Sequence, residues 1–138
     1  MRQLTKEELA ELNELNLLTN KIIGAAIEVH KELGPGLLES VYEECLAHEL
    51  RTIDLCVETQ VELPIKYKGE TLDKKYRIDV LVDKKIIIEL KSVEELKKVN
   101  EIQLVTYLKM SGMKMGLLIN FNVPKLVDGV KRKINGYM

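Results

Sequence analysis

Residues 76–93, YRIDVLVDKKIIIELKSV, decide the fold of this chain, because they encode two apolar strands joined by a short turn. The turn comprises residues 83–85, and the apolar residues on both sides of it occupy even positions. A three-residue turn places these residues on one face of a hairpin: Ile78, Val80, Val82, Ile86, Ile88 and Leu90. The same register places Asp79 opposite Glu89 on the other face, which also carries Lys91.

Two carboxylates that face each other on a sheet repel, and burial raises the pKa of at least one of them. A divalent cation would offset this repulsion, because hard cations prefer carboxylate oxygens. Arg77 and Lys91 would offset it equally well as an ion-pair network without metal. The spacing of Asp79 and Glu89 leaves both alternatives open.

The remaining segments predict helices around this hairpin. Thr5 and Glu8 form a capping-box pattern, and Gly34-Pro35-Gly36 ends the helical periodicity that follows. Pro64 indicates an edge strand or a bulge. The further predicted elements are a helix at about 37–53, a strand and hairpin at 56–72 with a turn at 68–70, a helix at 99–112, a strand at 114–122 and a terminal helix at 124–134.

This order, helix, helix, three strands, helix, strand, helix, predicts an α/β fold with a mixed central β-sheet flanked by helices. A length of 138 residues suits a single domain, 1–138, in which residues 1–16 form an N-terminal helical extension. No apolar run is long enough for a membrane span, and the mixed charge of the first residues argues against a signal peptide. Cys45 and Cys56 are expected to be free thiols in the cytoplasm.

A net charge of −1 means that nucleic acid, if bound, must contact a local patch of the lysines. Outside the hairpin, three further residues stand out. Glu39 lies along or beside the apolar stripe of the second helix, although the helix dipole alone would favour a glutamate in the first turn. Gln103 and Tyr107 are four residues apart and project from one helix face. Three other acidic residues of the second helix are expected to face water: Glu43, Glu44 and Glu49.

Several of these residues together resemble a known family. Residues 36–42, GLLESVY, fit the G-x-x-E-x-x-Y pattern of the GxxExxY proteins. Asp79 followed by Glu89-Leu90-Lys91 resembles the core motif of the PD-(D/E)xK nuclease superfamily, and Gln103-x-x-x-Tyr107 resembles a motif of its RecB-like exonucleases. Ile78 departs from the proline of the superfamily name, and Asn100 stands where the resemblance leads us to expect a histidine.

The resemblance implies a restriction-endonuclease-like (PD-(D/E)xK) core and a set of roles. Glu39, Asp79, Glu89 and the backbone carbonyl of Leu90 would hold Mg²⁺ or Mn²⁺, which activates water and stabilises charge on phosphate. Lys91 would be catalytic together with Glu39, Asp79 and Glu89, and would orient or deprotonate the water and contact the phosphate. The substrate-positioning residues would be Gln103, Tyr107 and Tyr42. His30 is a further candidate ligand, with a packing or capping role as the alternative.

The sequence therefore predicts a metal-dependent nuclease, of exonuclease type, that hydrolyses phosphodiester bonds in DNA. The first alternative is a catalytically weak nucleic-acid- or protein-binding module on a nuclease fold. The second is an assembly domain whose charged sheet face is an ion-pair network. A homodimer is compatible with the small size of the chain.

Overall fold

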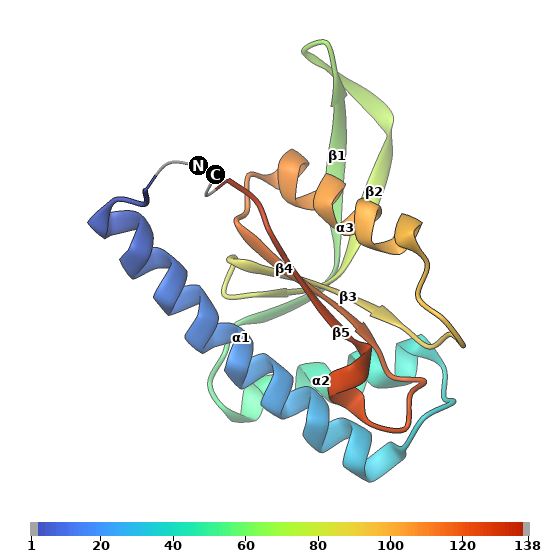
Figure 1. Cartoon of the computed structure of the whole chain (residues 1–138). Helices are drawn as coiled ribbons and strands as arrows, with labels where there is room; N and C mark the ends of the chain where they lie inside the picture. The colour runs from blue at the N-terminus through green and yellow to red at the C-terminus, as the bar shows by residue number, and fades with distance from the viewer. Residues whose placement is uncertain (1–2, 137–138) are drawn as a thin grey trace.

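Five strands form one mixed sheet in the spatial order β1-β2-β3-β4-β5 (Figure 1). The computed structural model describes residues 3–136. The strands span Val57–Tyr67 (β1), Glu70–Val82 (β2), Ile86–Lys91 (β3), Met115–Asn120 (β4) and Val130–Ile134 (β5). Only β3 and β4 are parallel neighbours, and helix α3 (Lys98–Ser111) provides the crossover that such a pair requires. The predicted mixed α/β sheet is confirmed.

Two helices precede the sheet and cover one of its faces (Figure 1). Helix α1 spans Lys6–Leu33 and begins with the predicted capping box, in which the side chains of Thr5 and Glu8 each accept a hydrogen bond from the other's backbone N–H. Helix α2 spans Glu39–Thr52. Within the predicted extension at 1–16, residues 6–16 are helical and continue without a break into the rest of α1. Residues 1–2 lie outside the described part of the chain.

The sheet separates two apolar cores. The first lies against α1 and α2 and contains most of the even-numbered apolar residues of the hairpin: Val80, Val82, Ile86, Ile88 and Leu90. The second lies against α3 and is centred on Leu104, Tyr107 and Leu108. Ile78 was expected in the first core but packs in the second. The β1–β2 pairing omits Asp79 and Gln60 between Val80 and Ile78, and Gln60 has a left-handed backbone there, so the regular alternation of side chains is broken.

The predicted register of the hairpin is confirmed. Val80 pairs with Ile88 and Val82 with Ile86, and the turn at 83–85 has two left-handed residues, Asp83 and Lys84. Pairing between β2 and β3 stops at Val80 and Ile88, while β3 continues alongside β4 to its end. The two strands therefore separate at Asp79, and this separation makes room for the candidate site.

The end of the chain differs from the prediction. Residues 124–134 were expected to form a helix, but they form a short 3₁₀ turn, η1 (Leu126–Gly129), followed by strand β5. Strand β5 lies beside β4 and pairs antiparallel with it (Figure 1). Strand β4 is buried along its whole length. A buried strand cannot leave the hydrogen-bonding groups of one edge unpaired, so this non-local pairing outweighs the local helical pattern. Gly129 allows the close approach, because a Cβ there would meet the backbone oxygen of Asn120.

Strands β1 and β2 form a long hairpin that extends beyond the rest of the sheet (Figure 1). Its turn falls at Lys68-Gly69, as predicted, and Gly69 has the positive φ that a tight turn requires. Pro64 lies in the edge strand β1, and the register shifts between Pro64 and Lys66, so both expectations for this proline are confirmed. No helix within residues 3–136 combines the length and the apolar character needed to cross a membrane.

Candidate active site

Glu89 is the most perturbed acid of the described chain. Its side chain lies in β3, is only 8% exposed, and its Oε1 atom has no hydrogen-bond partner among residues 3–136. Burial first, and then hydrogen bonding to Asp79 and the charge of Asp79, raise the pKa of Glu89 to about 10. The charge of Lys91 opposes this shift. Glu89 therefore keeps its proton at neutral pH in the metal-free protein.

Asp79 lies where β2 separates from β3. Its Oδ2 atom accepts a hydrogen bond of 2.9 Å from the backbone N–H of Leu90, so the carboxylate replaces a backbone partner that the separated strand no longer supplies. Asp79 borders a hollow of about 380 Å³, which is lined by Glu39, Ser40, Glu43, Gln60, Asp79 and Leu90. Asp79 and Glu89 thus lie close together, as predicted, and Asp79 is the one that borders the hollow.

Helix α2 brings two acids, Glu39 and Glu43, to this hollow. Glu39, the first residue of α2, is exposed, and it also lines a neighbouring hollow together with Lys91 and Asn100. Glu39 therefore stands between the Asp79 side and the Lys91 side of the site. The position of Lys91 at the end of β3 places its cation near Glu89, whose pKa it lowers.

Glu43 was expected to face water, and it does so only in part. Its side chain is half-buried, accepts a 2.6 Å hydrogen bond from Gln60 Nε2, and lines the same hollow as Asp79. Burial raises the pKa of Glu43, the hydrogen bond from Gln60 opposes the shift, and the charge of Asp79 adds to it. Glu43 lies one helical turn after Glu39, and this spacing is the sequence signal that could have identified it.

Gln103 and Tyr107 meet on α3, as their spacing predicts. Gln103 Nε2 donates a hydrogen bond of 2.6 Å to the Tyr107 hydroxyl. Tyr107 is buried, and its ring lies 5.0 Å from that of Tyr76. Burial and then the charge of Glu89 raise the pKa of Tyr107. The pair therefore lies on α3 within electrostatic reach of the buried acid, as one hydrogen-bonded unit.

Tyr42 and His30 are engaged elsewhere. Tyr42 is fully buried, stacks on Phe121, and its hydroxyl donates to the carbonyl of Gly34 and accepts from the N–H of Leu37. It holds the loop before α2 and has no free group for substrate, which corrects the substrate-positioning role expected for it. His30 Nε2 lies 2.8 Å from the carbonyl oxygen of Val123, which fits the packing alternative.

The part of the chain that the structure describes contains no group of three or more Asp, Glu, His or Cys side chains arranged to hold a metal ion. Glu39 and His30 therefore do not complete a cluster with Asp79 and Glu89 in this arrangement. The physical reasons differ: Glu39 is an exposed side chain at a helix start, and the His30 ring is engaged with the loop after β4.

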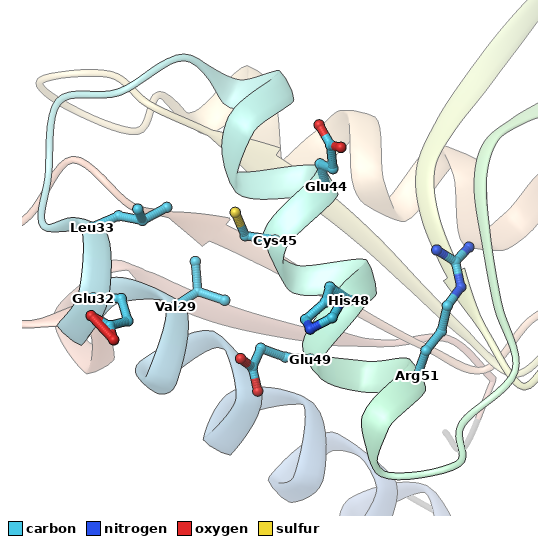
Figure 2. Close-up of a pocket in the computed structure, with 8 residues that line it drawn as sticks. All are labelled: Val29, Glu32, Leu33, Glu44, Cys45, His48, Glu49 and Arg51. Carbon is cyan, nitrogen blue, oxygen red and sulfur yellow. The ribbon is translucent and has the colours of Figure 1, made fainter.

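A wider hollow of about 640 Å³ lies between α1 and α2 (Figure 2). Val29 and Leu33 contribute to it from α1, and Cys45 and His48 contribute from α2. None of the predicted site residues lines it. Its size alone does not mark it as the active site, because the perturbed acids lie around Asp79 instead.

Paired acids and a lysine on adjacent strands of a helix-flanked mixed sheet define a restriction-endonuclease-like domain. A family model described as the PD-(D/E)XK nuclease superfamily matches residues 16–133, and the chain belongs to this superfamily. No curated protein matches the chain. Among solved structures it is similar to the crystal structure of SSO0001, with 25% identity and a TM-score of 0.47. The match covers 68% of this chain and 47% of that one, so the chain spans about half the length of that structure.

Proposed function

We propose that this chain is a divalent-metal-dependent nuclease that hydrolyses phosphodiester bonds in DNA. The observation that carries the proposal is the pair formed by Asp79 and Glu89. A buried carboxyl oxygen without a partner beside a second carboxylate is costly in a purely structural role. Membership of the superfamily supports the choice of nuclease chemistry for this pair.

The donor set fits a hard divalent cation such as Mg²⁺ or Mn²⁺. Glu89 Oε1 lacks a partner among the described residues, and Asp79 is held in place by the Leu90 amide. Glu39 and the Leu90 carbonyl belong to the same proposal, because both residues line the hollow beside Asp79. A cation bound there would lower the pKa of a water molecule and offset charge on the phosphate.

The other residues have roles that follow from their positions. Lys91 lies at the end of β3 and shares a hollow with Lys97, but Glu39, Glu94 and Glu95 also line it, so the two lysines would contact a phosphate together with a bound cation. Lys91 also orients or deprotonates the attacking water. Gln103 and Tyr107 restrain the side of the site next to Glu89.

The GxxExxY pattern at 36–42 and the Gln103–Tyr107 pair support a GxxExxY protein of RecB-like exonuclease type. Cytoplasmic location and a homodimer stay predictions from the sequence. One observation favours the alternative of a catalytically weak binding module. Among residues 3–136, no three Asp, Glu, His or Cys side chains are arranged to hold a metal ion. Asn100, at a position where the resemblance leads us to expect a histidine, lines the hollow with Lys91.

Cleavage of labelled single- and double-stranded DNA tests the proposal, measured over a Mn²⁺ titration with an EDTA control. Asp79→Asn retains an acceptor for the Leu90 amide but loses the charge, so we expect cleavage to fall by at least about 100-fold. Asp73→Asn, at an exposed position of the β1–β2 hairpin, is the matched control and should cleave as the wild type does.

Equal cleavage by the Asp79→Asn variant and the wild type would overturn the proposal. Calorimetry separates the two candidate functions. Binding of Mn²⁺ that is lost in Glu89→Gln supports the enzyme. A wild-type protein that binds DNA but neither binds Mn²⁺ nor cleaves supports the binding module.

A further inference from the structure

Gln60 has an unusual backbone conformation for a residue within a strand. Its φ is 53°, in the left-handed region that residues other than glycine seldom adopt. Regular pairing of β1 with β2 passes from Thr59 and Val80 directly to Val61 and Ile78, so it omits Gln60 and the residue opposite it, Asp79. Such conformations persist where the surrounding structure fixes them, and they concentrate at functional sites.

The side chain of Gln60 reaches from the sheet to α2. Its Nε2 atom donates a hydrogen bond of 2.6 Å to Oε1 of Glu43, and both residues line the hollow that Asp79 borders. Within residues 3–136 the Gln60 amide holds Oε1 of Glu43 and leaves Oε2 outside this hydrogen bond. The hydrogen bond restricts a glutamate that would otherwise sample several rotamers.

We propose that Gln60 is a positioning residue, which holds the Glu43 carboxylate toward Asp79 so that Glu43 becomes a further acid of the site when a divalent cation binds. This inference rests on the proposed function. It accounts for the left-handed residue in an edge strand, because the irregular pairing brings the Gln60 amide within reach of α2. It also accounts for the contact of Glu43 with a sheet residue, because the Gln60 amide donates to Glu43 Oε1 across the gap between β1 and α2.

Residues that orient the ligands of a metal commonly contribute a factor of 10 to 100 to its affinity. Gln60→Gly removes the amide and suits the left-handed backbone, so the strand is not weakened. Thr59→Gly is the matched control, because it places glycine one residue earlier in the same strand but leaves the amide of Gln60 intact. Both variants are made in the full chain.

The dissociation constant for Mn²⁺ is measured by calorimetry for the wild type and both variants. We expect Gln60→Gly to bind Mn²⁺ at least about tenfold more weakly, with an unchanged or higher melting temperature, and Thr59→Gly to bind like the wild type. DNA cleavage by Gln60→Gly should show a lower kcat with an unchanged KM. A purely structural role would instead lower the melting temperature and leave the affinity for Mn²⁺ unchanged.

A second readout needs no metal. The side-chain amide signals of Gln60 in the NMR spectrum should shift in Glu43→Ala and stay in place in Glu44→Ala. Equal Mn²⁺ affinity of Gln60→Gly and the wild type would overturn the inference, as would an equal loss in Thr59→Gly. A wild-type protein that binds Mn²⁺ but does not cleave DNA would contradict the proposed function. The Mn²⁺ affinity of Gln60→Gly relative to that of the wild type would still decide the role of Gln60.

Discussion

Replacing Glu89 with glutamine should stabilise the metal-free protein. The unfolded chain ionises this carboxyl near the ordinary glutamate pKa of 4.5, whereas the folded protein holds the pKa at about 10. Between these two values the folded state keeps a proton that the unfolded state has released, so wild-type stability falls as the pH rises. A glutamine has nearly the same shape, carries no titratable proton and can still donate to Asp79, and so it avoids this loss.

The magnitude follows from the pH interval. At pH 7 the solution lies 2.5 pH units above 4.5, and each unit corresponds to about 1.36 kcal/mol, which gives an upper bound of about 3.4 kcal/mol. Relaxation of the site and water entry reduce the gain, so we expect about 1–3 kcal/mol for Glu89→Gln. For a domain of this size, that gain raises the melting temperature by roughly 3–10 °C.

The assay is urea unfolding in EDTA at several pH values. The difference between Glu89→Gln and the wild type should be small near pH 5 and grow steadily toward pH 8, because wild-type stability is lost only above the unfolded-state pKa. Glu28→Gln, at an exposed position of α1, is the control and should show no such trend. A variant that is less stable than the wild type at pH 8, or a difference that does not change with pH, would refute this reasoning.

Two further predictions concern the framework of the site. Tyr42→Phe keeps the stacking on Phe121 but removes the hydroxyl between Gly34 and Leu37, so we expect a loss of about 1–3 kcal/mol in urea unfolding; an unchanged midpoint would contradict the contact. Gly129→Ala should destabilise by about 1–3 kcal/mol in thermal unfolding, because the new methyl group meets the Asn120 oxygen. Gly24→Ala, where a Cβ has open space, is its control and should be neutral or stabilising.

The parity of apolar residues was sufficient to bring Asp79 beside Glu89, although β2 and β3 are no longer paired at these two residues. Side chains alternate along a regular strand, so a turn of known length leaves only one register that buries both apolar sets, and this holds from Val80 to Leu90 although not at Ile78. Helical spacing likewise predicted that Gln103 and Tyr107 meet. These relations are local, and their physical cause lies in backbone geometry.

Relations between distant segments were decided by the tertiary structure alone. Glu43 looked like a surface residue on its own helix, and only the packing of α2 beside β1 shows that it meets Gln60. Residues 130–134 became a strand because buried β4 needed a partner along its open edge. The sequence by itself determined the two strands of the 76–91 hairpin, their register and the proximity of Asp79 and Glu89. The tertiary structure decided which helix acid joins them, because that depends on how separate elements pack rather than on the pattern within any one of them.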